Sequence, residues 1–152
     1  MEDLKTNLKN TMAQWASGVS VVTTRREGLV YGITVSSFTS VAMEPPLIAV
    51  CLNRENRLAE MVELSGRFAV SLLAAGQQDV SNYFASSGRE PTETFTEVAT
   101  DNYQGLPVVT DALGHLICQV HEVIDLGTHA FVVGRVQHTR SHEDSGALLY
   151  WR

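Results

Sequence analysis

The sequence has few cysteines, no large basic cluster and no long apolar run, and each shortage excludes a class of protein. Without a run of about 18 apolar residues, no membrane-spanning helix is predicted. The formal net charge is −6, and no basic cluster exceeds Arg25-Arg26. This speaks against nucleic acid, because phosphate neutralisation supplies most of that affinity. The polar N-terminus lacks the apolar stretch of a signal peptide, so we expect a cytoplasmic protein that binds neither membrane nor nucleic acid.

Several motifs of reactive or nucleotide-binding sites are also missing. Cys51 and Cys118 lie far apart in apolar runs without CxxC spacing, which favours buried reduced thiols, with a disulfide as the alternative. The eleven glycines include no GxG pair, so the dinucleotide fingerprint GxGxxG is absent, as is the GxxxxGK[ST] loop. His138 and His142 alone have i, i+4 spacing, and their polar setting predicts a solvated loop instead of a metal site.

What the chain does contain is a series of short β-branched runs separated by tight turns. We expect strands at residues 19–24, 30–36, 47–52, 68–73, 116–126 and 130–138. Short helices are expected at residues 4–16, near 61–64 and at 77–84, with a long loop at 85–104. Strands and helices do not alternate regularly, which disfavours a parallel α/β sheet. Residues 1–152 therefore predict one mainly β domain, a small closed antiparallel barrel of roughly six strands with a few short helices.

A hydroxyl-rich segment follows the second expected strand. Five of the ten residues in 32–41 carry a hydroxyl, and the segment runs toward Pro45-Pro46. Hydroxyls and exposed N–H groups at the end of a strand can hold the polar edge of a flat heterocycle. The alternative is a Ser/Thr-rich turn that satisfies its own backbone, and composition alone favours this alternative.

Several segments, taken in order, resemble the flavin reductase family, the small partners of two-component flavin-dependent monooxygenases. The matching segments are Trp15–Thr24, Gly32–Phe38, Ser40-Val41, Pro45–Leu52, Ser65–Leu73, Tyr83–Ala85 and Gly127–Val136. Each alone is weak, but together they cover nearly the whole chain. The resemblance implies a six-stranded antiparallel split β-barrel of the FMN-binding type. It also implies a homodimer with flavin in a groove at its interface, which fits the apolar character of both sides of 47–52.

The resemblance also implies which residues bind the flavin. The residues expected along the isoalloxazine edge are Thr34, Val35, Ser36, Ser37 and Phe38, with Thr39 and Ser40 beside them. Those expected at the ribityl phosphate are Asn53, Arg54, Asn56 and Arg57. Relatives often have small hydroxylated residues in this second segment, whereas this chain has Glu55, Asn56 and Leu58. A solvated linker that begins a helix is an equally weighted alternative, although a helix start itself attracts phosphate.

The third segment is the hairpin turn Gly127-Thr128-His129. Relatives commonly have Gly-Asp-His here, and the resemblance associates that histidine with nicotinamide nucleotide binding. Thr128 replaces the acid, so no role of the acid transfers. Leu148–Arg152 resembles the closing aromatic stretch of the family but ends earlier than many relatives.

The resemblance implies NADH- or NADPH-dependent reduction of free FMN or FAD, with the reduced flavin passing to a partner monooxygenase. His129 is the residue expected to orient the nicotinamide. A non-catalytic flavin-binding or storage protein is one alternative. An oxidoreductase that retains its flavin and acts on another substrate is a second, since a shared fold does not separate these functions.

Overall fold

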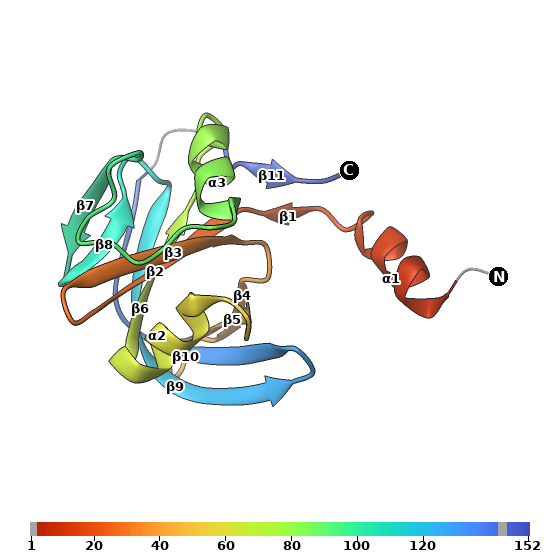
Figure 1. Cartoon of the computed structure of the whole chain (residues 1–152), viewed down its shortest axis with the longest axis horizontal. Helices are drawn as coiled ribbons and strands as arrows, with labels where there is room; N and C mark the ends of the chain where they lie inside the picture. Colours follow the sequence, from red (N-terminus) through yellow and green to blue (C-terminus); the bar gives the residue numbers. More distant parts are fainter. Residues whose placement is uncertain (1–2, 143–145) are drawn as a thin grey trace.

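Seven antiparallel strands form the central sheet of the computed structural model, which describes residues 3–142 and 146–152 (Figure 1). In the order β3-β2-β6-β9-β10-β5-β4, they span Leu29–Val35, Ser20–Arg26, Arg67–Leu72, Gly114–Leu126, His129–Ser141, Leu47–Asn53 and Thr39–Ala42. Two short sheets pair β1 (Ser17–Gly18) with β11 (Leu149–Tyr150) and β7 (Thr100–Tyr103) with β8 (Leu106–Val109). The helices are α1 (Leu4–Met12), α2 (Arg57–Ser65) and α3 (Gln78–Ala85).

The expected mainly β, antiparallel architecture with a few short helices is confirmed, but its central sheet has seven strands and not six. The additional strand is β4, which forms because the hydroxyl-rich segment pairs with β5. The expected long loop at 85–104 contains β7, whose polar sequence gives little strand signal and which is set by pairing with β8. No helix in the described part of the chain is long and apolar enough to span a membrane.

Local turn and cap chemistry fixes the two ends of α2, and its buried face holds it against the barrel. Asn56 is its N-cap and accepts a hydrogen bond from the Leu58 N–H, and Gly66 ends the helix with φ 75°. Three residues of α2 are fully buried in the main core, namely Leu58, Ala59 and Val62. Full burial of one such leucine or valine stabilises the fold by about 1.5–3 kcal/mol. This packing makes α2 a rigid wall beside the loop that follows β5.

The barrel is split between β3 and β5, and one side chain bridges the split. Residues 36–38 connect β3 to β4, the two outer strands of the sheet order. The Ser37 hydroxyl donates to the Cys51 carbonyl and accepts from the Cys51 N–H, both at 3.1 Å. Ser37 thereby takes the place of a neighbouring strand at this point of β5, and it fixes the path of the segment that carries the expected flavin edge.

Close packing on β10 requires a glycine at position 134. A Cβ atom there would lie 2.5 Å from Cζ of Phe68 and 2.9 Å from Cβ of Cys118. Both neighbours are fully buried, so neither can move aside without disturbing the core.

We therefore expect Gly134→Ala to destabilise the protein by about 1–3 kcal/mol, the usual cost of overpacking a core. The matched control is Gly76→Ala, because a Cβ at Gly76 meets nothing within 4 Å. Its effect should stay within about 1 kcal/mol. Urea denaturation of both variants measures the difference, and equal stability would show that the β10 core can relax around an added methyl group.

Candidate functional site

The hydroxyls expected to hold flavin are partly used by the chain itself. The Thr34 hydroxyl donates to the Ser81 carbonyl of α3 at 2.7 Å, and the Thr39 hydroxyl donates to the Ser40 carbonyl at 3.3 Å. Ser37 is engaged with Cys51, as described above. Only the Thr39 bond lies within the segment, as in the turn that satisfies its own backbone, whereas Thr34 and Ser37 bond to backbone groups of α3 and β5. The exposed hydroxyls of Ser36 and Ser40 form no hydrogen bond within the described residues.

The backbone between β3 and β4 supplies a second set of donors. The N–H groups of residues 36–38 have no hydrogen-bond partner among the residues that the structure places. Three consecutive N–H groups at an exposed strand end suit the carbonyls and ring nitrogens at the edge of a flat heterocycle. Val35 points into the core and Phe38 is half-buried against it, so these two position the segment.

A groove of about 440 Å³ adjoins these donors. Its lining residues are Lys9, Met12, Ala13, Trp15, Ser17, Ser36, Ser37, Tyr150 and Arg152. The adjoining hollow of about 430 Å³ shares Trp15, Ser17 and Ser36 with it. No site role was predicted from the sequence for Trp15, Ser17, Tyr150 or Arg152. A signal existed for all four, because Trp15–Thr24 and Leu148–Arg152 both resemble segments of the family.

The expected phosphate segment forms the loop between β5 and α2. Asn53 accepts the Glu55 N–H at 2.9 Å, and Asn56 accepts the Leu58 N–H at 2.9 Å as the helix cap. Both side-chain amides keep their NH₂ groups as donors. Arg57, in the first turn of α2, pairs with exposed Glu90 at 2.9 Å. The helix start, the two amides and Arg57 together can hold an anion, and the alternative of a solvated helix start describes the same residues.

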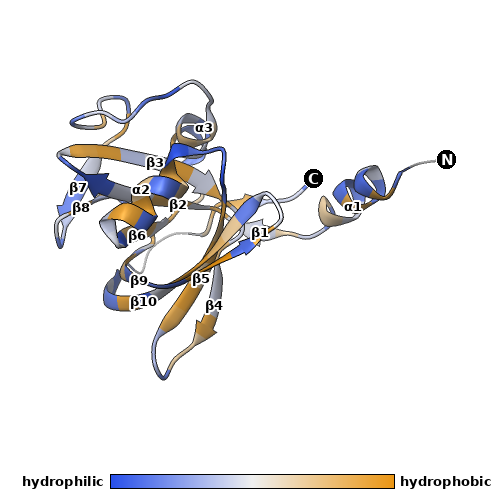
Figure 2. Cartoon of the chain, turned by 60° about the horizontal axis from the view of Figure 1, so that its bottom comes forward, coloured by the Kyte–Doolittle hydropathy of each residue, from blue (hydrophilic) through white to orange (hydrophobic). Residues whose placement is uncertain are grey.

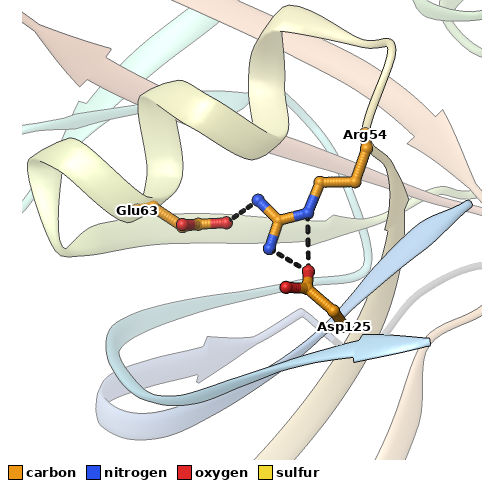
Figure 3. Close-up of polar contacts among 3 residues, drawn as sticks. All are labelled: Arg54, Glu63 and Asp125. Atoms are coloured by element: carbon orange, nitrogen blue, oxygen red, sulfur yellow. Dashed lines mark hydrogen bonds and ion pairs between the residues drawn. The ribbon is translucent and has the colours of Figure 1, made fainter.

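Arg54 differs from the rest of this segment because its guanidinium is held by two carboxylates (Figure 3). Nε donates to Oδ1 of Asp125 on β9 at 2.9 Å, and the terminal nitrogens contact Asp125 and Glu63. The hydrogen bond that Arg54 donates to Asp125 raises the pKa of Arg54, and the bond donated to Glu63 adds to this, against a smaller lowering by desolvation. Its assignment to the flavin phosphate stays a prediction, but two carboxylates of the chain compete with any phosphate.

His129 begins β10, directly opposite Asn53 on β5. Its Nδ1 is hydrogen-bonded to the Thr128 hydroxyl at 2.9 Å. The carbonyl of Thr128 accepts the Arg54 N–H at 3.0 Å. The structure thus brings the hairpin tip and the loop after β5 into direct contact, and the half-buried imidazole has its Nε2 edge available.

All three expected segments meet along one strand. Thr39 pairs with Ala49 and Ser37 contacts Cys51, while His129 pairs with Asn53. Four residues of a strand span about 13 Å, so this distance separates the two ends of the constellation. Strand β5 therefore connects the backbone donors of residues 36–38, the start of α2 and His129.

The thiols give this site no nucleophile. Burial raises the pKa of Cys118 to about 12, so this thiol is protonated in the core. Cys51 lies on the outer face of β5, and both cysteines are free, as the sequence predicted. Nor do the described residues bring together three potential metal ligands. The chemistry available here is the binding and orientation of flat, phosphorylated ligands.

A split antiparallel barrel with backbone donors beside an open groove is typical of proteins that bind a flat heterocyclic cofactor. The chain belongs to the flavin reductase family, because residues 12–152 match the model of the flavin reductase like domain.

Relatives and solved structures support this placement. The chain is 34% identical over 149 residues to the reductase component of 4-hydroxyphenylacetate 3-monooxygenase from Thermus thermophilus, covering 98% of this chain and 93% of the relative. A probable flavin reductase from Rhizobium meliloti is 36% identical over 91% of this chain, which spans 43% of that longer protein. The NADH:FAD oxidoreductase of Streptomyces globisporus, solved with NAD and FAD fragments, aligns with a TM-score of 0.91. That comparison has 27% identity and covers 99% of this chain and 92% of the other.

Arg57 gives a test of the phosphate assignment. We expect Arg57→Ala to weaken FMN binding about three- to tenfold and to leave riboflavin binding nearly unchanged, because only FMN carries the phosphate. The upper range is modest because Arg57 is exposed and already paired with Glu90. Flavin fluorescence titration measures both affinities, and Arg25→Ala serves as a control at an exposed arginine of β2 whose Nε donates to the Gly105 carbonyl at 3.2 Å. Equal losses for the two flavins would contradict phosphate contact.

Proposed function

We propose that this chain is the flavin reductase component of a two-component monooxygenase system, using a nicotinamide nucleotide to reduce FMN or FAD. Its family membership supports this function, as does the NADH:FAD activity named for the Streptomyces relative. The reduced flavin then serves a partner monooxygenase, the arrangement named for the Thermus relative.

The observation that carries the proposal is the alignment of three binding elements along β5. Ser37, within the donor segment 36–38, lies beside Cys51, two residues or about 7 Å before Asn53, where His129 and the loop leading into α2 lie. A flavin with its ring at the first element and its phosphate at the second would follow the strand. His129 lies opposite Asn53, about 7 Å along β5 from the residue that Ser37 contacts. A nicotinamide that approaches from the hairpin side can therefore contact His129 while its ring lies against the flavin ring.

Each residue has a binding or orienting task in this scheme. The N–H groups of 36–38 and the Ser36 hydroxyl hold the flavin edge, and Asn53, Asn56 and Arg57 hold the phosphate. His129 orients the nicotinamide. When both nucleotides are bound, hydride passes from nicotinamide C4 to flavin N5, chemistry that the cofactors supply themselves. The chain contributes proximity, and no general base is required.

NADH oxidation with a large excess of free FMN or FAD separates this function from its rivals. A reductase turns over many flavins per protein, and removal of oxygen should leave reduced flavin free in solution. A storage protein would bind flavin stoichiometrically without oxidising NADH. An enzyme that retains its flavin would stop after one equivalent under anaerobic conditions unless its second substrate is added. Either of these last results would reject the proposal.

A homodimer is part of the proposal, and exposed apolar surface supports it. Helix α1 projects from the barrel (Figure 1), and it leaves Leu4, Leu8 and Met12 more than half exposed. The outer face of β9 and its hairpin also exposes Ile124 and Leu126. Hydropathy colouring shows apolar stretches on β4 and β5, beside this face (Figure 2). A second copy would bury these residues. Light scattering should return twice 16.7 kDa at micromolar protein, and a monomer would exclude the dimer.

His129→Ala tests the nicotinamide assignment. Loss of one neutral hydrogen bond is worth roughly 0.5–1.5 kcal/mol, so we expect the KM for NADH to rise a few-fold to about tenfold. Fold and flavin affinity should change little, because the side chain lies at the start of a strand outside the core. Anaerobic stopped-flow measurement of flavin reduction across NADH concentrations gives the answer. Wild-type rates and affinity in the variant would return His129 to the status of an ordinary turn residue.

A further inference from the structure

Packing alone does not fix the tip of the β9–β10 hairpin. Residues 124–128 are all exposed, and the turn passes through Gly127 with φ 59°. Exposed hairpin tips with few apolar contacts open locally at low free-energy cost. His129 is the last pair of the β10–β5 ladder, opposite Asn53, so movement of the tip acts on the end of that ladder and on the direction of this side chain.

Arg54 holds this tip at two places. Its backbone N–H donates to the Thr128 carbonyl at 3.0 Å, one residue before His129. Its side chain donates from Nε to Asp125 at 2.9 Å, and Asp125 lies opposite Ala130 in the hairpin register. One contact holds a residue of the turn, and the other holds a residue of β9 just before it.

The other end of the connection is rigid. The Arg54 guanidinium also contacts Glu63 on α2, the helix whose inner face is buried in the main core (Figure 3). Exposed single ion pairs contribute little, but a planar guanidinium shared by two carboxylates is a network with defined geometry. The side chain of Arg54 is 35% exposed and that of Asp125 is 76% exposed, so solvent screens these charges and the contact depends on the fixed geometry of the three groups.

Charge argues against a direct ligand role for the same guanidinium. One positive charge faces two carboxylates, so the cluster of Arg54, Glu63 and Asp125 has a net charge of −1. A bound phosphate would add negative charge to a cluster that is already negatively charged, or it would have to displace one of the two carboxylates.

We propose that Arg54 is a positioning residue which, through Glu63 and Asp125, clamps the β9–β10 hairpin to α2 and so keeps His129 beside the loop after β5. This inference rests on the proposed function, because its kinetic consequence is in the binding of the nicotinamide nucleotide.

The experiment compares Arg54→Met, Asp125→Asn and the double variant, with Arg26→Met as the matched control. Arg26 is an exposed arginine with its own carboxylate partner, Glu27, at 3.5 Å, and it lies on the β2–β3 hairpin. Both single variants should raise the KM for NADH about three- to tenfold, with kcat and the Kd for FMN changed less than about twofold. The double variant should be no worse than the poorer single variant, because both changes open one clamp. Arg26→Met should behave like the wild type.

Hydrogen exchange supplies a readout that does not depend on activity. Amides in residues 122–131 should exchange faster in Arg54→Met and Asp125→Asn than in the wild type, while those of α2 keep their protection. Unchanged exchange and unchanged KM in both variants would overturn the proposal and leave a solvated surface cluster. If the wild type oxidised no NADH, the proposed function would fail, but the exchange measurement would still decide whether the clamp exists.

The direction in which flavin affinity changes in the two single variants distinguishes a clamp from a phosphate anchor. If Arg54 bound the phosphate, Arg54→Met would weaken FMN far more than riboflavin. Asp125→Asn would then strengthen FMN binding, because it removes a carboxylate that competes for the guanidinium. A clamp gives the same direction of change in both variants and no difference between the flavins. Opposite signs would therefore overturn the proposal.

Discussion

The hydrogen bonding of strand β5 is the constraint on which the candidate site depends. On one side β5 pairs with β10 over seven residues, and on the other with only the short strand β4 and the bridging hydroxyl of Ser37. The first pairing places His129 opposite Asn53. The second leaves the connection 36–38 with unpaired N–H groups, because a side chain stands where a strand would otherwise pair. A complete sheet at this edge would have used those donors internally.

Most of the polar side chains expected to bind ligand also hold the protein together. Thr34 ties β3 to α3, Asn56 caps α2, and Arg54 connects a helix to a hairpin. What remains for ligands is largely neutral: backbone N–H groups, amide NH₂ groups and a few hydroxyls. Arg57 is the arginine of the loop with a single exposed partner, which suits a chain whose net charge of −6 repels anions at a distance.

The outer face of the barrel also carries apolar residues. Strand β5 buries Ile48, Val50 and Leu52 in the core, while Ala49 is also fully buried on its other side. A strand apolar on both faces needs cover on both, and the projecting α1 has an apolar face of its own left uncovered. In the proposed homodimer, a second copy would cover the apolar face of α1 and the half-buried Leu47 and Cys51 on the outer face of β5.

Sequence alone determined the elements whose signals are local. Alternating β-branched runs, the Glu27-Gly28 turn and the Gly66 helix stop were readable because backbone preference acts within a few residues. Residue resemblance likewise indicated the three segments of the candidate site. Only the tertiary structure decided that Thr39–Ala42 forms a strand and that Thr100–Tyr103, within the expected loop, forms another. Their strand propensity is weak, and pairing with β5 and β8 stabilises them. The tertiary structure also decided the partners of Arg54, since Glu63 and Asp125 lie 9 and 71 residues away, and no local pattern encodes which carboxylates a folded chain brings to one guanidinium.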